Sequence, residues 1–172
     1  GFLPEWKDPE TPWDIFRSGQ DGITGQIRRC LEEEESVFIH PTAVIGENVF
    51  IEGPSYIGKG AEIRHGAYLR KGSWICNNSL VGHSSEVKNS ILLPGSKVPH
   101  FNYVGDSIIG LGANLGAGVK LSNVRNDSRE ILLSIGRRRV GSGLSKLGAM
   151  IGDGSQVGCN TVTNPGTIIP PF

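Results

Sequence analysis

Aliphatic residues recur at every sixth position through the first half of the chain. The series begins at Ile39 and has no gap: Ile39, Ile45, Ile51, Ile57, Ile63, Leu69, Ile75, Val81, Val87 and Leu93. Four places after most of them stands a small residue, such as Ala43 or Ser73. This period fits neither a helix nor an alternating strand, but it suits short flat strands joined by tight corners. Since three such strands close one coil, the pattern predicts an all-β parallel β-helix of stacked coils.

The period returns after two interruptions. It resumes at Ile109, Leu115 and Leu121, and again at Ile151, Val157, Thr163 and Ile169. We interpret the interrupting segments, residues 94–106 and residues 124–147, as loops that leave the prism. The second segment is polar and basic. Loops on a rigid scaffold often carry function, but a solvated excursion without a role fits this segment equally well.

Helix signals precede the repeat. Thr11 is a good N-cap with Pro12 in the first helical position, and residues 24–34 form a second candidate. We expect residues 1–36 to be a short helical extension that caps the open first coil, and residues 37–172 to be the β-helix domain. A linker remnant of a missing domain is the alternative. The chain opens on Gly1 rather than methionine, so we expect that upstream sequence has been removed.

Composition argues against several classes of protein. Seventeen Lys and Arg balance seventeen Asp and Glu, so no overall field favours nucleic acid. No stretch approaches the roughly 18 apolar residues of a membrane helix, and the N-terminus lacks a signal-peptide layout. We therefore expect a cytoplasmic protein without membrane insertion. Cys30, Cys76 and Cys159 lie far apart, which fits a reducing compartment and predicts neither a disulfide nor a metal site.

Residues 18 apart fall into one column of the stack, with roughly 4.8 Å between neighbouring strands. Arg70 and Lys88 are 18 apart, so two cations lie side by side. A phosphate between them would relieve their repulsion, and a solvated pair splayed apart is the alternative. The acidic residues Glu62 and Glu86 are close enough in sequence to neutralise part of this charge.

His65 and His83 share a second column, on an outer surface. Two histidines can bind a metal, as in a γ-type carbonic anhydrase on such a scaffold, but that site needs a third histidine. Exposed, stacked imidazoles are therefore the favoured interpretation.

Large aromatic residues also point outward. Trp74 and Tyr56 are 18 apart, and with Tyr68 they form a half-apolar stripe that suits a subunit contact. Coverage of this stripe by the N-terminal helices, with Trp13 and Phe16, is an equally good interpretation.

Candidate chemistry concentrates in and after the first interruption. His100 follows a proline at a position where a core has no need of an imidazole, and its pKa range suits a general base near neutrality. Tyr103 follows three places later, and residues 114–118 and 122–123 read Asn-Leu-Gly-Ala-Gly and Ser-Asn.

These repeats and motifs resemble the left-handed parallel β-helix of hexapeptide acyltransferases. Residues 39–169 are similar to the acetyltransferase domain of bifunctional N-acetylglucosamine-1-phosphate uridyltransferase/glucosamine-1-phosphate acetyltransferases, and to the C-terminal domain of sugar-1-phosphate nucleotidylyltransferase-like proteins. The likeness is strongest over residues 96–123 and 144–164. It implies a left-handed coil and His100 as the general base. The implied substrate-binding residues are Arg70, Lys88, Tyr103, Asn114 and Arg129, and the implied acetyl-CoA contacts are Ala117, Asn123 and Cys159.

The sequence departs from this family at several points. Arg129 replaces a lysine, Cys159 replaces a serine, and Val124 replaces an aromatic residue that often follows the asparagine. The glycine-rich signature of nucleotidyl transfer is absent, so we expect no such activity from this chain. The chain also ends at Phe172, where the family continues into further coils.

The resemblance implies a homotrimer with sites between subunits. Each site would transfer acetyl from acetyl-CoA to the amine of an amino-sugar 1-phosphate, a step of nucleotide-sugar synthesis. Backbone N–H groups of residues 116–118 are candidates to stabilise the oxyanion. The alternative is a catalytically weak binding or assembly module of the same pathway.

Overall fold

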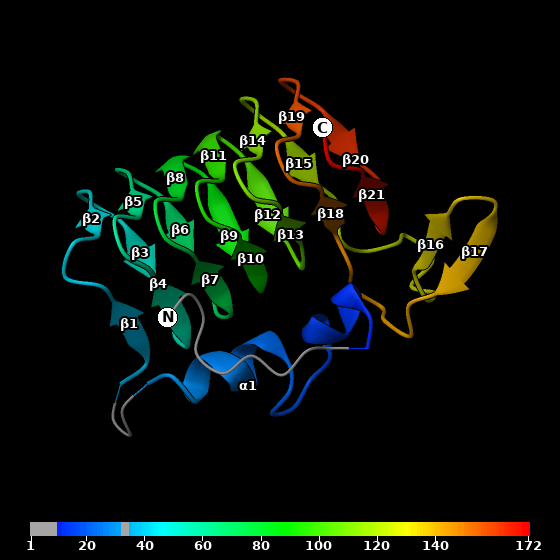
Figure 1. Cartoon of the computed structure of the whole chain (residues 1–172), viewed down its shortest axis with the longest axis horizontal. Helices are drawn as coiled ribbons and strands as arrows, with labels where there is room; N and C mark the ends of the chain where they lie inside the picture. Colours follow the sequence, from blue (N-terminus) through cyan, green and yellow to red (C-terminus); the bar gives the residue numbers. More distant parts are fainter. Residues whose placement is uncertain (1–9, 32–34) are drawn as a thin grey trace.

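The computed structural model describes residues 10–31 and 35–172. Short parallel strands stack in three rows, which form the sides of a three-sided prism (Figure 1). We name them sides A, B and C in the order in which each coil passes through them. Side A contains β1 (Val37–Ile39), β4 (Ser55–Ile57), β7 (Ser73–Ile75), β10 (Ser90–Leu92), β13 (Ile108–Ile109), β18 (Ala149–Ile151) and β21 (Thr167–Ile169). Side B contains β2 (Val44–Ile45), β5 (Glu62–Ile63), β8 (Leu80–His83), β11 (Lys97–His100), β14 (Asn114–Leu115) and β19 (Gln156–Val157). Side C contains β3 (Phe50–Ile51), β6 (Tyr68–Leu69), β9 (Glu86–Lys88), β12 (Tyr103–Gly105), β15 (Lys120–Leu121) and β20 (Val162–Thr163).

The repeating aliphatic residues line the core of the prism. Ile57 pairs in register with Ile75, and both side chains are fully buried, as is Ile109 on the same side. At the first coil, Ile39 and Ile45 remain 41% and 36% exposed. The prediction of an all-β parallel β-helix of hexapeptide repeats is confirmed.

Small residues at the corners are mostly buried serines. Ser73 Oγ donates to the carbonyl oxygens of Arg70 and Val87 at 2.6 and 3.0 Å, and Ser79 Oγ donates to that of Leu93 at 2.9 Å. Because an unpaired buried hydroxyl is costly, these bonds explain why a polar residue fits at a corner.

One predicted inward position is wrong by one residue. Leu92, not Leu93, is fully buried in register with Ile75, and Leu93 is only partly buried. The interpretation of residues 94–106 as a loop is also wrong, because this segment forms β11 and β12 within the prism.

The cause is a shortened corner between sides C and A. The step from one inward residue to the next falls from six positions to five twice, at Val87–Leu92 and at Val104–Ile109. Each short corner contains one non-glycine residue in the left-handed region, Asn89 (φ 44°) or Asp106 (φ 48°). Asn and Asp tolerate this region better than most residues, so the deletions are accommodated without glycine.

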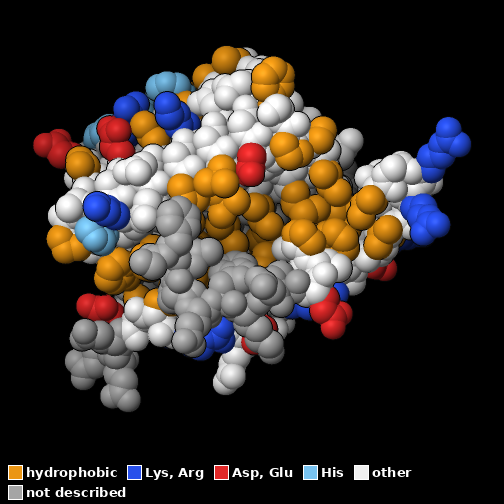
Figure 2. Space-filling view, viewed as in Figure 1, with side chains coloured by type: hydrophobic (Ala, Val, Ile, Leu, Met, Phe, Trp, Pro, Cys, Tyr) orange, Lys and Arg blue, Asp and Glu red, His pale blue; other side chains and the backbone are white. Residues whose placement is uncertain are grey.

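Residues 124–147 do leave the prism, as predicted. This excursion departs from the same C–A corner and forms an antiparallel hairpin of β16 (Leu132–Ile135) and β17 (Arg138–Gly141) (Figure 1). A bridge between Val124 and Lys146 closes its root. Basic side chains stand at the far end of the hairpin in Figure 2.

The N-terminal helices lie along side A, so the prediction that they cap the first coil is wrong (Figure 1). The 3-10 helix η1 (Pro12–Phe16) begins with the predicted cap at Thr11, and α1 (Ile23–Arg28) is shorter than the predicted helix, part of which lies outside the described residues. No helix of the described residues is long and apolar enough to cross a membrane. The boundary between residues 36 and 37 remains a prediction, although β1 begins at Val37.

Apolar contacts explain this placement of the helices. Trp74 is 1% exposed and belongs to one apolar cluster with Trp13 and Phe16, and Tyr56 packs against that cluster. The helices therefore cover most of the predicted aromatic stripe within one chain. Tyr68 lies apart, on side C.

Candidate functional site

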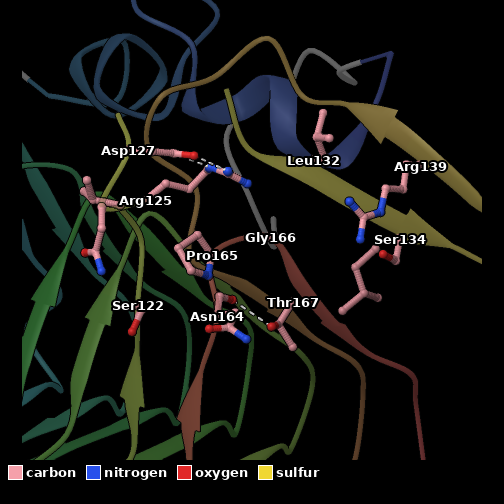
Figure 3. Close-up of a pocket in the computed structure, with 13 residues that line it drawn as sticks. Ser122, Arg125, Asp127, Leu132, Ser134, Arg139, Asn164, Pro165, Gly166 and Thr167 are labelled. Carbon is pink, nitrogen blue, oxygen red and sulfur yellow. Dashed lines mark hydrogen bonds and ion pairs between the residues drawn. The ribbon is translucent and has the colours of Figure 1, made fainter. Parts of the chain in front are cut away.

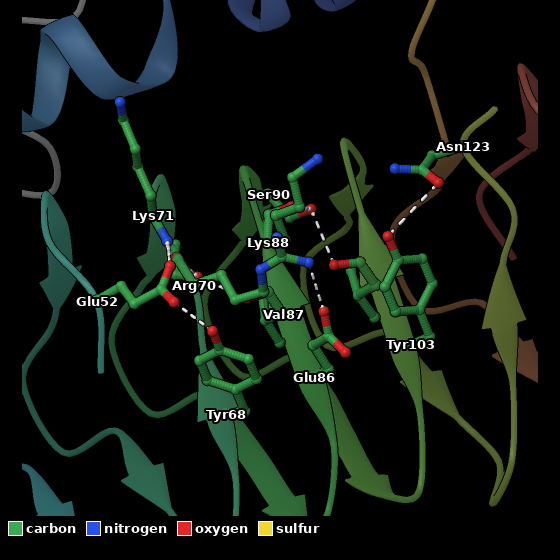
Figure 4. A network of polar contacts seen from close by, with 12 residues as sticks. Glu52, Tyr68, Arg70, Lys71, Glu86, Val87, Lys88, Ser90, Tyr103 and Asn123 are labelled. Atoms are coloured by element: carbon green, nitrogen blue, oxygen red, sulfur yellow. Dashed lines mark hydrogen bonds and ion pairs between the residues drawn. The ribbon is translucent and has the colours of Figure 1, made fainter. Parts of the chain in front are cut away.

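Charged and polar side chains gather at the outer end of side C. We call this set the corner cluster, and Figure 4 shows most of it. It consists of Glu52, Tyr68, Arg70, Glu86, Lys88, Tyr103, Asp106 and Asn123. The strands place these residues in successive coils, since Tyr68 pairs with Glu86 and Glu86 with Tyr103. Four predicted site residues thus come together here: Arg70, Lys88, Tyr103 and Asn123.

Each predicted phosphate-binding cation has an acidic partner. Arg70 Nη1 lies 2.9 Å from Glu86 Oε1, and this hydrogen bond raises the pKa of the guanidinium. Lys88 Nζ lies 3.5 Å from Asp106 Oδ2. The expectation that Glu62 would share this role is wrong, because Glu62 faces outward on side B and bonds Arg64.

Glu52 and Tyr68 extend the cluster toward the first coil. The Tyr68 hydroxyl donates to Glu52, and this bond lowers the pKa of Glu52 and raises that of Tyr68. The backbone N–H of Lys71 also donates to Glu52, at 3.4 Å. The Arg70 guanidinium carbon lies 6.0 Å from the centroid of the Tyr68 ring, and the charges of both Glu86 and Glu52 help to raise the pKa of this guanidinium.

Asp106 is the buried centre of the cluster, and sequence analysis did not single it out. It is 3% exposed, and three side chains approach its carboxylate: Lys88 Nζ at 3.5 Å, Asn89 Nδ2 at 2.7 Å and Asn123 Nδ2 at 2.5 Å. One signal could have found it, because Asp106 stands 18 residues after Lys88, the spacing of one column. The shortened coil of 17 residues then places Asp106 in register with Asn89.

Tyr103 and Asn123 meet over Gly105. The Tyr103 hydroxyl lies 3.5 Å from Asn123 Oδ1. A Cβ atom at position 105 would lie 2.7 Å from the Tyr103 hydroxyl and 2.8 Å from Asn123 Nδ2, so this contact requires glycine. Burial raises the pKa of Tyr103, and the charges of Glu86 and Asp106 raise it further. The phenol therefore stays protonated near neutrality.

A second set of predicted residues forms a column at the B–C corner. Gly118 N–H donates to the carbonyl of His100, and Asn160 N–H to that of Ala117, which places His100, Ala117 and Cys159 on successive coils. His100 and Cys159 are exposed and Ala117 is partly buried. The predicted base and two predicted cofactor contacts therefore share one edge of the prism.

Asn102, which the sequence did not single out, fixes the turn after His100. Its side chain is 2% exposed, accepts the His100 N–H at 2.9 Å and donates to the Gly116 carbonyl at 2.6 Å. The proposed use of Gly116 and Gly118 as oxyanion donors is wrong, because both N–H groups donate to the neighbouring coil at 2.7 and 2.9 Å.

The histidine column continues below His100. The His65 and His83 rings stack with centroids 5.4 Å apart, and His83 Nδ1 lies 2.9 Å from the His65 carbonyl. The interpretation as stacked imidazoles is confirmed. Among the described residues, no three His, Cys, Asp or Glu side chains are placed to hold a metal ion.

Two predicted substrate residues lie away from both sets. Asn114 is on side B, in register with Lys97 and Gln156, and Arg129 is exposed on the excursion. Within one chain, neither joins the corner cluster.

Cavities distinguish these regions. A cavity of about 320 Å³ lies between α1 and the corner cluster and is lined by Thr24, Glu52, Arg70, Lys71, Lys88 and Asn89. A larger cavity of about 830 Å³ lies between the excursion and the last coils, with Arg125, Arg139 and Asn164 on its walls (Figure 3). No predicted site residue lines the larger cavity, so its size does not identify the site.

The fold and the repeats define a hexapeptide-repeat β-helix protein. The chain matches the family described as the GMPPB C-terminal domain over residues 51–171, and it belongs to that family. A crystal structure of a hexapeptide transferase family protein from Anaplasma phagocytophilum has a similar fold, with a TM-score of 0.50 at 20% identity over 78% of this chain and 69% of that chain.

Archaeal bifunctional proteins are similar in sequence. The bifunctional protein GlmU of Methanococcus maripaludis strain S2 is 42% identical over 171 residues, which cover 95% of this chain and 41% of the relative. A bifunctional sugar-1-phosphate nucleotidylyltransferase/acetyltransferase of Sulfurisphaera tokodaii is 42% identical over 92 residues, covering 54% of this chain and 23% of the relative. The chain therefore spans about two fifths or less of the length of these relatives.

Proposed function

We propose that this chain is an acetyl-CoA-dependent acyltransferase of nucleotide-sugar synthesis. It transfers acetyl to the amine of an amino-sugar 1-phosphate such as glucosamine 1-phosphate. Family membership and the acetyltransferase activity in the printed name of the Sulfurisphaera relative support this proposal. The observation that carries it is the gathering of Arg70, Lys88, Tyr103 and Asn123 in one cluster beside a cavity.

The corner cluster suits a phosphorylated sugar. Arg70 and Lys88 are partly exposed, with side chains 38% and 22% accessible, and each retains N–H groups beyond the one that bonds its carboxylate. These groups can bind phosphate oxygens. The carboxylates of Glu52 and Glu86 and the Tyr103 hydroxyl offer acceptors to sugar hydroxyls. Such positioning supplies several kcal/mol toward a reaction barrier.

The B–C column suits the thioester. In the proposed reaction, the neutral amine of the sugar attacks the thioester carbonyl carbon and His100 takes a proton from the nitrogen. The C–S bond then breaks, and the CoA thiolate leaves and receives a proton from the His100 imidazolium. Since Gly116 and Gly118 use their N–H groups, we assign the oxyanion contact to the N–H of Ala117.

A homotrimer is part of this proposal. His100 and Lys88 lie at opposite ends of side C, at the end of β11 and the end of β9. A second copy would bring its own B–C column against the corner cluster of the first. This arrangement would also give Asn114 and Arg129 a route to the substrate from another subunit.

Thiol release tests the function. The chain is incubated with acetyl-CoA and glucosamine 1-phosphate, and free CoA is followed with a thiol reagent while mass spectrometry identifies the product. We expect amine-dependent release and an N-acetylated sugar phosphate. Glucose 1-phosphate, which lacks the amine, and glucosamine, which lacks the phosphate, are the matched controls.

Two outcomes would contradict the proposal. Acetyl-CoA binding in calorimetry without turnover on any amino-sugar phosphate would favour the binding or assembly module. Equal turnover of glucosamine and glucosamine 1-phosphate would show that the enzyme does not recognise the phosphate, and it would exclude the proposed role of Arg70 and Lys88.

A further inference from the structure

The orientation of the Asn123 amide is determined by its neighbours. An ionised carboxylate can only accept hydrogen bonds. The atom of Asn123 that lies 2.5 Å from Asp106 Oδ2 must therefore be the NH2 group. The amide oxygen then faces the Tyr103 hydroxyl, 3.5 Å away. An oxygen in that place can only accept, so the Tyr103 O–H donates to it.

Because the Tyr103 hydroxyl donates its one proton to Asn123, its oxygen can still accept a hydrogen bond. We propose that Asp106 is a positioning residue that sets the polarity of the Tyr103 hydroxyl, so that Tyr103 accepts a hydrogen bond from an N–H or O–H group of the bound sugar. The inference rests on the proposed function, because it concerns the substrate of the same site. It assigns Tyr103 to a substrate donor rather than to the phosphate, which has only acceptors when fully ionised.

The surrounding backbone holds this arrangement rigid. The Asp106 carbonyl accepts the N–H of Gly148 at 2.8 Å, and the Asn123 carbonyl accepts that of Leu147 at 2.9 Å. The C-terminal end of the excursion is thereby tied to the two residues that set the polarity. A Cβ atom at Gly148 would lie 2.2 Å from the Gly105 carbonyl oxygen, so the end of the excursion packs closely against the prism.

Two substitutions of Asp106 separate polarity from charge. Asp106→Ala removes the acceptor, which frees the Asn123 amide to turn over. Asp106→Asn removes the charge but can keep an amide oxygen toward Asn123. The NH2 group of the new asparagine would then face Asn89, and the Asn89 amide can turn so that its oxygen accepts this hydrogen bond. We expect Asp106→Ala to lower kcat/KM for the amino-sugar phosphate by about 10-fold to 100-fold, and Asp106→Asn to stay within about threefold of the parent chain. An equal loss in both variants would overturn the proposal.

A double-mutant cycle tests whether the effect passes through Tyr103. In a Tyr103→Phe background there is no hydroxyl to orient, so Asp106→Ala should lower kcat/KM by no more than about twofold further. If the fold-losses of the two single variants multiplied in the double variant, Asp106→Ala would act independently of Tyr103, and the proposal would be contradicted. Asp153→Ala is the control, since that exposed carboxylate accepts the N–H of Leu111 in the preceding coil, away from the corner cluster, and its loss should leave kcat/KM unchanged.

A second variant covers the case in which Asp106→Ala does not fold. Gly105→Ala inserts a methyl group between Tyr103 and Asn123 and leaves the Asp106 contacts in place. It should reproduce the loss of kcat/KM, and it too should add nothing in the Tyr103→Phe background. Full activity of a folded Gly105→Ala chain would overturn the proposal.

An ultraviolet titration of the tyrosines tests the inference without turnover. The difference between the parent chain and Tyr103→Phe isolates the ionisation of Tyr103. Asp106→Asn and Asp106→Ala both remove a charge that raises the pKa of this phenol, so both should lower it. Asp106→Ala should lower it further, because a turned Asn123 amide presents its NH2 group to the phenol oxygen and favours the phenolate. If the parent chain shows no acetyl transfer but this difference is seen, the proposed reaction fails and the hydrogen bonds from Asp106 to Tyr103 stand. Equal shifts in the two variants refute those hydrogen bonds.

Discussion

The B–C and C–A corners of the prism differ in how regular their lengths are, and they carry different sets of the predicted site residues. At the B–C corner every step between inward residues is six positions, from Ile45–Ile51 to Val157–Thr163. At the C–A corner two steps are five positions long, and one contains the whole excursion of residues 124–147. The corner cluster lies at the irregular corner.

Regular and irregular corners build different kinds of surface. Where every coil has the same length, equivalent residues stack in a column, as His65, His83 and His100 do. Such an edge suits an extended ligand that lies along the stack. Where coils are shortened or interrupted, residues from different coils converge, as Lys88, Asp106 and Asn123 do. Such a corner suits a compact polar ligand that is bound from several sides.

The largest expected effect is at the regular corner. We expect His100→Ala to lower kcat by about two to four orders of magnitude, because it removes the general base. The exposed side chain contributes nothing to the core, so the melting temperature should not change. Steady-state kinetics with both substrates saturating provides the measurement. His83→Ala, one coil below, is the matched control, and a loss of less than fivefold in His100→Ala would exclude His100 as the base.

Restoring a six-residue step at the shortened C–A corner should disrupt the corner cluster. A glycine inserted after Asn89 returns that step to six positions and relaxes the left-handed backbone that holds the Asn89 side chain against Asp106. We expect kcat/KM to fall by about 100-fold, the effect of a displacement of roughly 1 Å in a site.

The matching insertion tests whether this loss is specific. A glycine placed between Asn164 and Pro165 lengthens a C–A corner that already has six positions. It should have little effect on kcat/KM. If both insertions reduced activity equally, the shortened corner would have no special role.

The sequence predicted the regular parts of the molecule and missed the irregular ones. The period of six placed Ile57, Ile75 and Ile109 in the core, because each coil repeats the same steric requirement. It failed at Leu93, where one deleted residue shifts the phase and no composition signal marks the change. The position of the helices was also missed, since it depends on the apolar contacts of Trp74 with a distant segment.

The same limit applied to the site. Column arithmetic placed Arg70 beside Lys88, and Glu86 bonds Arg70, but Asp106 was missed although it stands 18 residues after Lys88. The 17-residue coil puts Gly105 in register with Lys88, so Asp106 reaches Lys88 from the corner that follows. The resemblance implied roles for Tyr103 and Asn123, but their contact over Gly105 depends on how side chains of successive coils pack, which sequence spacing does not determine. Roles that depend on a second subunit, such as those of Asn114 and Arg129, remain predictions.

Lys88 tests the corner cluster alone. We expect Lys88→Ala to raise KM for the sugar phosphate by about tenfold and to leave KM for acetyl-CoA nearly unchanged, because it removes one charged hydrogen bond to the phosphate. Asp106 keeps its contacts with Asn89 and Asn123, so the cluster should remain folded. Lys97→Ala, on side B, is the control. A parallel rise in both KM values would place Lys88 at the cofactor instead.

Cys159 tests the regular edge with the smallest expected change. Cys159→Ser restores the residue that the resembling family has, and as an exposed, near-isosteric change it should alter KM for acetyl-CoA by less than about twofold. Alkylation of Cys159 in the parent chain should instead block acetyl-CoA, because the adduct would protrude into the edge shared with Ala117 and His100. Cys76 gives an internal control, since burial raises the pKa of its thiol to about 12 and should protect it from the reagent. Peptide mapping after brief treatment with iodoacetamide, with and without acetyl-CoA, measures the labelling. If Cys159 reacted equally in both samples, with activity retained, the cofactor would not lie along this edge, and the division of roles between the two corners would be wrong.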